Sequence, residues 1–484
     1  MFSLLAANGA ISLSRRQLHR LGFAGMVSSN RLSTLLAKDS VSPHKAKRCI
    51  YIYLCGGPSQ LDLWDPKPDA VDGIRSEFKP IETNVPGIMF TELIPNLAKH
   101  ASKLALIRSM THTSTDHNVS SAHTLHGYPP IRPDDVYAAP TDHPAIGAIL
   151  HKLKGDTGLL PPWVILPRPF TTASPPIKGQ SGGFLGSTYD AVSMNEPKQD
   201  SLAPKDLKFS AFDLPPGVGE SRLKSRRQLL SKLDDNSTSP YLGSRWDNMS
   251  ETAATMITSE KCTKAFDLTR EDPRLRDHYG RNEYGQSFLL ARRLVESGVR
   301  FVNVFWTYFD DKGCQFNLWD NHGVASAVCG TGGVSKGRDM LTHPYCTPSF
   351  DKAFPALLED LENRGMLDDT LVVVAGEFGR TPKINPFVGR DHWPNCYTQL
   401  LAGGGVRGGQ IYGQSDKNAA YVKDKPVNRV SHLFSSTPVM LSPVGDTGLD
   451  TIADGIAASL SRDDLTLLIA KLAMRSATMV GSAS

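Results

Sequence analysis

Apolar runs alternate along this chain with segments of helical periodicity. Residues 371–375 are an uninterrupted apolar and mostly β-branched run, which is typical of a strand buried on both faces of a parallel sheet. Shortly before it, Phe354, Leu357, Leu358 and Leu361 recur at helical spacing, and a glycine follows at the position of a helix C-cap. The pattern therefore predicts a helix, a turn and a buried strand in this order.

Similar elements recur earlier in the chain. We expect strands at 48–55, 104–107, 163–166 and 299–305, and helices at 93–101, 143–152 and 286–296. Strands and helices that alternate in this way pack into one sheet with helices on its faces. The sequence therefore predicts an α/β domain with a largely parallel sheet and helices on both faces.

Two regions depart from this alternation. Residues 168–270 are rich in Pro, Gly, Ser and Asp, and we expect an insertion that lies over the carboxyl edge of the sheet. The alternative is a long loop without a functional role. Residues 421–484 are rich in Ser, Thr and Asp and are expected to form a divergent C-terminal segment. The main domain is thus predicted to span residues 48–420.

The net charge of +4 is unevenly distributed, because residues 1–48 carry +7 and the remainder −3. The main domain therefore gives no reason to expect a nucleic-acid partner. Arg15 and Arg16 precede a short, weakly apolar run that resembles a twin-arginine export signal, and we expect this signal to cover residues 1–37. It implies passage through the twin-arginine translocase to the periplasm or the cell surface. The alternative is a disordered basic tail.

No stretch of the chain is long and apolar enough for a transmembrane segment. The seven cysteines are scattered and form no C-x-x-C pair, which argues against a zinc ribbon and against a disulfide framework. One or two disulfides within 314–346 are compatible with the spacing. Cys346 opens the sequence CTPSF, in which Phe350 stands where the sulfatase motif C-x-P-S-R has arginine. We therefore expect Cys346 to be an unmodified thiol or a disulfide partner.

Carboxylates and imidazoles follow the predicted strand ends. The candidate metal ligands are Asp62, Asp320, His322, Glu377 and His392. Because the carboxyl ends of strands in an open sheet share one crevice, we expect these side chains to converge on a divalent metal ion. Mixed carboxylate and imidazole ligands suit Zn, Mn or Fe, and an all-oxygen subset suits Mg or Ca.

Simpler roles are open for each of these residues. Asp62 lies in a Gly-rich loop that is also compatible with a structural turn, and Asp320 with His322 can belong to a loop without metal. Glu377 has Arg380 and Arg390 within reach in the sequence as partners for a structural ion pair.

The stretch from Ser109 to His126 is rich in hydroxyl groups and imidazoles. A Ser or Thr that is deprotonated against a metal ion acts as nucleophile in phosphatase-type chemistry. The residue types alone leave the nucleophile open. The catalytic candidates are Ser59, Ser114, Thr115 and His117.

Three motifs, GEFGRTP, GRDHWP and AGGGVRGGQIYGQSD, resemble the DUF1501 family, which is assigned to the alkaline-phosphatase-like superfamily. The resemblance extends from about Cys49 to Asp416. It implies an alkaline-phosphatase-like fold and an exported, metal-dependent hydrolase of sulfate or phosphate esters, including those of polysaccharides. The superfamily carries Asp-His where this chain has Glu377-Phe378, so one ligand of a two-metal site is lost. The alternative is a non-catalytic member that binds a surface glycan or a protein partner.

Overall fold

The computed structural model describes residues 46–127, 137–171, 176–195, 197–204 and 256–428, with strands at 2–6 and 9–13 and isolated positions between 207 and 229. The strands β1 (Phe2–Ala6) and β2 (Gly9–Leu13) pair antiparallel and belong to a unit, residues 1–43, that is distinct from the rest of the chain. Arg15 and Arg16 lie outside the described residues, so the export signal stays a prediction.

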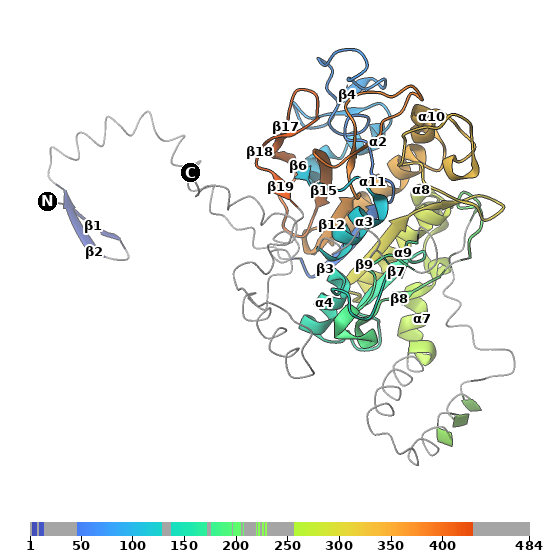
Figure 1. The fold of residues 1–484 in the computed structure, drawn as a ribbon. Helices are drawn as coiled ribbons and strands as arrows, with labels where there is room; N and C mark the ends of the chain where they lie inside the picture. Colours follow the sequence, from blue (N-terminus) through green and yellow to red (C-terminus); the bar gives the residue numbers. More distant parts are fainter. Residues whose placement is uncertain are drawn as a thin grey trace. The chain divides into compact units, whose positions relative to one another are not determined.

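A large sheet forms the centre of the second unit (Figure 1). Among the described residues it has nine strands. Their order is β16 (Gln410–Tyr412), β6 (Leu104–Thr111), β15 (Tyr397–Ala402), β12 (Thr370–Ala375), β3 (Arg48–Leu54), β9 (Phe301–Trp306), β7 (Trp163–Leu166) and β8 (Val192–Ser193), and β19 (Val427–Asn428) pairs with β6. β15 runs antiparallel to both β6 and β12, and the other pairings are parallel. The predicted largely parallel sheet is confirmed.

Among the described residues of the second unit, four two-stranded hairpins lie outside this sheet. They are β4 (Pro80–Glu82) with β5 (Met89–Thr91), β10 (Tyr308–Phe309) with β11 (Gln315–Phe316), β13 (Gly379–Arg380) with β14 (His392–Trp393), and β17 (Gln414–Ser415) with β18 (Val422–Asp424). The α-helices are α2 (Pro95–Ala98), α3 (His117–His126), α4 (Ile146–Lys154), α7 (Glu260–Phe266), α8 (Pro273–Tyr279), α9 (Glu283–Ser297), α10 (Gly337–Thr342) and α11 (Thr347–Asn363).

The central strand β3 shows why helices cover both faces of the sheet. Its alternate residues Ile50 and Ile52 belong to the hydrophobic core on the side of α9 and α11. Tyr51 and Tyr53 belong to a second core on the side of α3 and α4. All these side chains are buried, because a strand in the middle of a doubly covered sheet has no solvent face.

The long helices end where the sequence predicts. Asn282 caps α9 by accepting a hydrogen bond from the Gly285 N–H at 2.8 Å, and α9 ends at Gly298, whose φ of 117° is easily reached by glycine. After α11, Gly365 has a φ of 65°. The helix, turn and strand from α11 to β12 are therefore confirmed.

Other regions differ from the prediction. β6 continues to Thr111, so part of the expected hydroxyl-rich loop is strand. The next residues form α3, whose N-cap Asp116 accepts from the Val119 N–H at 2.9 Å and whose last turn ends at Gly127. The sequence did not predict α3, because few of its residues are apolar and its polar side chains are largely buried.

The two irregular regions contribute strands. β8 lies within residues 168–270 and pairs with β7, and β18 and β19 lie within the C-terminal segment. Cys314 is disulfide-bonded, and Cys346 is a buried free thiol directly before α11. The structure is therefore compatible with the expectation of an unmodified thiol at Cys346.

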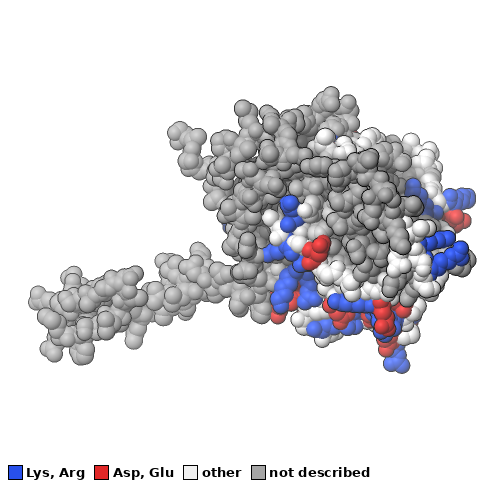
Figure 2. All heavy atoms as spheres, turned by 90° about the horizontal axis from the view of Figure 1, so that it is seen from below, with Lys and Arg blue, Asp and Glu red and all other residues white. Residues whose placement is uncertain are grey.

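No helix among the described residues is long and apolar enough to cross a membrane. On the face shown in Figure 2, the described Lys and Arg side chains stand next to Asp and Glu side chains. β3, β6, β9 and β12 all run in the same direction, so their carboxyl ends meet at one edge of the sheet. This is the edge at which open α/β sheets bind ligands.

Candidate metal centre

Asp320 lies at the centre of a group of basic side chains at the carboxyl edge of the sheet. Its Oδ2 is 3.1 Å from His117 Nε2 and 3.3 Å from His322 Nε2, and its Oδ1 is 3.1 Å from His392 Nε2. The guanidinium of Arg380 lies 2.6 Å from Oδ1. We call Asp320, these four partners and Glu377 the imidazole cluster.

Glu377 follows β12 and is fully buried. Its Oε1 lies 2.6 Å from His117 Nδ1 and accepts a hydrogen bond from the Gly56 N–H at 2.7 Å. Its Oε2 has no hydrogen-bond partner although the atom is buried. A buried carboxylate oxygen without a partner is energetically costly, and its presence calls for an explanation such as a ligand.

Two positions in the loop after β3, Gly56 and Gly57, must be glycine to allow this arrangement. A Cβ atom on Gly56 would lie 2.7 Å from both Asn317 Nδ2 and the Asp320 nitrogen, and one on Gly57 would lie 2.6 Å from the Phe378 ring. Both glycines also have positive φ angles, 117° and 74°. The two glycines therefore let the end of β3 approach the loops that carry Asp320 and Glu377.

Arg380 positions Asp320 and has no exposed surface. Its Nε donates to the Gly57 carbonyl at 2.8 Å, its Nη1 to the Arg390 carbonyl at 3.2 Å, and its Nη2 to the Gly56 carbonyl. Because carbonyls and Asp320 take these donors, the guanidinium fixes the carboxylate and cross-links three loops. The anticipated ion pair of Glu377 with Arg380 is absent from the described contacts, since Arg380 pairs with Asp320 instead.

The charges within the cluster are strongly coupled. Burial disfavours the charged form of His117, but the hydrogen bonds and charges of Asp320 and Glu377 outweigh it and raise the pKa of His117 to about 9. Burial likewise favours the neutral form of Asp320, yet the Arg380 charge and the imidazole hydrogen bonds hold the pKa of that carboxyl well below its usual range. The hydrogen bond to Asp320 raises the pKa of His322.

The donor set fits a divalent metal ion. Among the described residues, one group offers three or more metal-ligating side chains close together, namely His117, Asp320 and His392, whose donor atoms all lie within 4.8 Å of one another. His322 also directs its Nε2 to Asp320. Glu377 lies outside this group, because it contacts Nδ1 of His117 whereas Nε2 of the same ring faces Asp320. Imidazoles with carboxylates suit Zn, Mn or Fe better than Mg or Ca, which prefer oxygen ligands alone.

The structure does not bring Asp62 into the imidazole cluster. Both of its carboxylate oxygens are bound by Arg390, from Nε at 2.9 Å and from Nη2 at 3.2 Å. Ser59 and Ser76 donate to the same two oxygens at 2.7 and 2.8 Å. Since Arg390 lies two residues before His392, Asp62 positions the loop that carries a candidate ligand.

The nucleophile candidates have different surroundings. The Ser59 hydroxyl is buried and donates to Asp62, and the Ser114 hydroxyl accepts from the Asp116 N–H at 3.3 Å. Thr115 is exposed, and its carbonyl lies 2.9 Å from His392 Nδ1, so it adjoins the imidazole cluster directly. The choice between these hydroxyl groups stays open.

The sequence predicted different roles for two residues of this centre, His117 and Arg380. His117 was a catalytic candidate and is a candidate ligand, because α3 begins at this residue and turns its ring toward Asp320 and Glu377. Arg380 had been considered as a partner of Glu377. Its position three residues after Glu377, within GEFGR, was the only sign in the sequence that Arg380 belongs to this centre. Its contact with Asp320 is apparent only in three dimensions.

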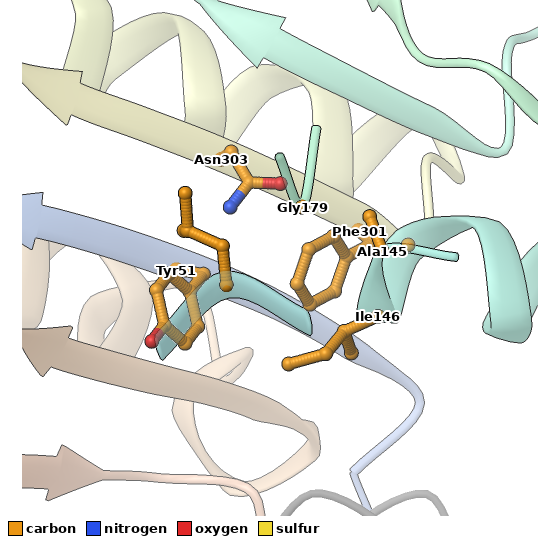
Figure 3. Close-up of a pocket in the computed structure, with 8 residues that line it drawn as sticks. Tyr51, Ala145, Ile146, Gly179, Phe301 and Asn303 are labelled. Atoms are coloured by element: carbon orange, nitrogen blue, oxygen red, sulfur yellow. The ribbon is translucent and has the colours of Figure 1, made fainter. Parts of the chain in front are cut away.

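A separate cavity lies between the sheet and α4 (Figure 3). Tyr51 of β3, Phe301 and Asn303 of β9 and Ile146 of α4 are among its lining residues, and its volume is about 10 Å³. This is room for about one water molecule. The cavity is therefore too small for a substrate.

The fold and the cluster define an α/β protein with a polar, metal-compatible centre at the carboxyl edge of its sheet. The chain belongs to the family described as "Protein of unknown function (DUF1501)", which matches residues 46–441. The predicted family is thus confirmed. No curated protein matches this chain.

Several solved structures are similar in fold. They include the PsFucS1 sulfatase from Pseudoalteromonas sp. (14% identity, 82% of this chain and 70% of that chain covered, TM-score 0.32). Ps i-CgsB in complex with k-i-k-neocarrahexaose matches at 12% identity, with 80% and 70% covered and a TM-score of 0.35. Alkaline phosphatase from the Antarctic bacterium TAB5 matches at 12% identity, with 78% and 96% covered and a TM-score of 0.30.

Proposed function

We propose that the imidazole cluster binds one divalent metal ion and that the protein hydrolyses sulfate or phosphate esters there. The observation that carries this proposal is the combination of three imidazoles directed at Asp320 with the buried, unpartnered Oε2 of Glu377. Buried carboxylate oxygens usually have a donor, so the unpartnered Oε2 supports a role beyond structure.

The residues that would hold the ion are His117, Asp320 and His392, with His322 beside Asp320 and Glu377 behind His117. A bound divalent ion polarises an ester oxygen and lowers the pKa of a coordinated water or hydroxyl. Arg380 fixes the orientation of Asp320, and the Asp62–Arg390 pair fixes the loop of His392. Such partners behind the ligands set both geometry and affinity in metal sites.

The direct test is elemental analysis of purified protein after incubation with Zn, Mn, Fe, Mg or Ca. We expect about one equivalent of a transition metal in the wild type and little in His392→Ala and Asp320→Asn. His278→Ala is the matched control, because His278 is an exposed histidine that pairs with Glu359 away from the cluster. A folded wild type that takes up no metal would refute the proposal.

Activity is tested on the loaded protein with 4-nitrophenyl sulfate and 4-nitrophenyl phosphate. We expect turnover of at least one ester, and loss of turnover when a chelator removes the metal. Polysaccharide esters are the natural extension, and release of inorganic sulfate or phosphate from them can be measured in the same way. Metal uptake without turnover of any ester would contradict the hydrolase assignment while leaving the metal site intact.

One observation favours a binding role as the second candidate. The buried Ser59 hydroxyl is already bound to Asp62, so this candidate nucleophile is held away from the imidazole cluster. A metal centre that recognises a surface glycan or a protein partner needs no nucleophile. Binding of an anionic glycan without release of sulfate or phosphate would support this second function.

We further propose export through the twin-arginine translocase, on the strength of Arg15 and Arg16 ahead of a weakly apolar run. Export of a folded chain would allow metal to be loaded beforehand. Arg15→Lys combined with Arg16→Lys should retain the precursor in the cytoplasm, as measured by cell fractionation. Normal delivery of the double variant to the periplasm would contradict this proposal.

A further inference from the structure

A tight turn beside His322 carries an exposed aromatic ring next to a strained residue. Phe387 has 41% of its surface exposed. The following residue, Val388, has a φ of 53°. This left-handed conformation is rare for a β-branched side chain, and such strain persists only where the surrounding structure enforces it.

Hydrogen bonds hold this turn from within. The Asn385 side-chain oxygen accepts from the Phe387 N–H at 2.9 Å and the Gly389 N–H at 3.1 Å. Its Nδ2 donates to the His322 carbonyl at 2.8 Å and to Asp391 Oδ1 at 2.9 Å. Asn385 thus connects the turn directly to a candidate ligand.

A second set of bonds holds the turn from outside. The Gly337 N–H donates to the Phe387 carbonyl at 3.0 Å, and the Arg338 N–H donates to the Val388 carbonyl at 2.9 Å. The backbone of the turn that carries Phe387 is therefore held on both sides.

The turn packs directly on the backbone that carries His322. A Cβ on Gly389 would lie 2.4 Å from the Asn321 carbonyl oxygen and 2.5 Å from the His322 carbonyl oxygen. A Cβ on Gly323 would lie 2.8 Å from Phe387 Cβ. The Cβ atom of Phe387 therefore lies beside Gly323, the residue that follows His322.

His322 marks the side on which the imidazole cluster opens to solvent. Its side chain is 35% exposed, compared with 23% for His117 and 27% for His392. The backbone of Phe387 adjoins Gly323, the residue directly after this histidine. A single exposed ring is too small for a protein interface, which needs about 800 Å² from each partner.

We propose that Phe387 contacts the substrate and determines its class. The ring packs against a ring or apolar face of the alcohol part of the ester, while the anionic group binds at the imidazole cluster. This assignment rests on the proposed function, because it requires an anionic ligand at the cluster. Strained backbone residues such as Val388 cluster at ligand-binding sites, and a ligand ring would bury the exposed surface of Phe387.

The experiment uses non-hydrolysable probes that differ only in the group next to the anion. The metal-loaded protein is titrated calorimetrically with methylphosphonate and phenylphosphonate, and with methanesulfonate and benzenesulfonate. We expect the wild type to bind the phenyl member of at least one pair about three- to tenfold more tightly, as contacts between aromatic rings allow. Phe387→Ala should abolish this preference and leave the affinity for the methyl probe unchanged.

Two further variants guard against misfolding and nonspecific effects. Phe387→Leu keeps an apolar side chain and should retain part of the preference. Tyr421→Ala is the matched control, because Tyr421 is also exposed, at 56%, but packs on Trp393 and not on the His322 segment. It should leave the preference intact.

The possible failures are distinguishable. If the wild type binds neither methyl probe, the anion site and hence the proposed function fail, and this inference fails with them. If the methyl probes bind but the wild type shows no phenyl preference, or Phe387→Ala keeps it, the role of Phe387 alone is overturned.

Discussion

Two buried groups of charges lie in different parts of this domain, and they are built differently. The arginine cluster, on the helices that cover one face of the sheet, consists of Glu271, Arg292, Arg293, Asp360 and Arg364. Each of its four carboxylate oxygens lies within 2.8 Å of a guanidinium nitrogen. The imidazole cluster at the sheet edge instead combines three imidazoles with one carboxylate oxygen that has no hydrogen-bond partner.

The difference separates a structural role from a functional one. In the arginine cluster every negative oxygen is neutralised by a permanent cation, so the group needs nothing from solution. In the imidazole cluster the three rings remain partly exposed, and Glu377 is buried at the cost of an unpaired oxygen. Burial of charge alone thus identifies neither role, whereas the completeness of pairing distinguishes them.

The largest effect is expected when the arginine cluster is broken. Arg292→Met removes the guanidinium that Glu271 and Asp360 share and leaves each with its remaining arginine, which costs up to about 3–5 kcal/mol of folding free energy. The melting temperature, followed by circular dichroism, should fall by several degrees. Arg338→Met is the control, because Arg338 pairs with Asp339 on the surface and should change stability by less than about 1 kcal/mol. Equal shifts in both variants would contradict the structural role.

A smaller effect comes from the buried histidine His126. Burial lowers the pKa of His126 to about 3, and the charges of His143, His123 and Lys178 act in the same direction. The folded state therefore binds this proton less readily than the unfolded chain, and stability is lost as the pH falls below about 6.5. Between pH 7.5 and 5 this amounts to about 2 kcal/mol.

His126→Gln tests this by removing the titrating group while keeping a similar shape. From pH 7.5 to pH 5 the melting temperature of the wild type should fall more steeply than that of the variant, because the variant lacks the pH-dependent loss. Parallel pH profiles would show that His126 does not carry this dependence. Burial lowers the pKa of both His126 and His117, but Asp320 and Glu377 reverse this shift at His117 and raise its pKa.

The smallest effect on stability is expected at Glu377. Glu377→Gln retains an oxygen that can accept from the Gly56 N–H, and it removes a buried negative charge with an unpaired oxygen. The melting temperature of the metal-free protein should stay the same or rise. A large decrease would place Glu377 among the structural charges, together with the arginine cluster.

The sequence predicted the parts of the fold that depend on apolar periodicity. β7 has the expected bounds, and β3, β12, α9 and α11 differ by a few residues, because buried strands and amphipathic helices leave a direct pattern. α3 was missed because its sequence, HNVSSAHTLH, has little apolar content. The antiparallel β15 follows from long-range pairing with β6 and β12, which no local pattern shows.

The candidate site was only partly predictable for a related reason. The predicted strand ends indicated that Asp320, Glu377 and His392 lie at one edge of the sheet. In the structure His392 contacts Asp320, and His117 connects Asp320 to Glu377. The same reasoning included Asp62. Its carboxylate is instead bound by Arg390, which is 328 positions away in the sequence. Which carboxylate pairs with which cation depends on loop geometry, and this geometry is set by close contacts such as those of Gly56.

The central claim is that the imidazole cluster binds metal, and the most direct measurement is the stabilisation of the folded protein by added metal. Wild type and Glu377→Gln are stripped with a chelator and melted with increasing Zn²⁺, Mn²⁺ or Fe²⁺. A ligand at 100 times its dissociation constant stabilises the folded state by about 2.7 kcal/mol, so the wild-type melting temperature should rise with at least one metal. Glu377→Gln should need at least about tenfold more metal for the same rise. An unchanged wild-type melting temperature with every metal, or identical titration curves for the two proteins, would contradict the claim.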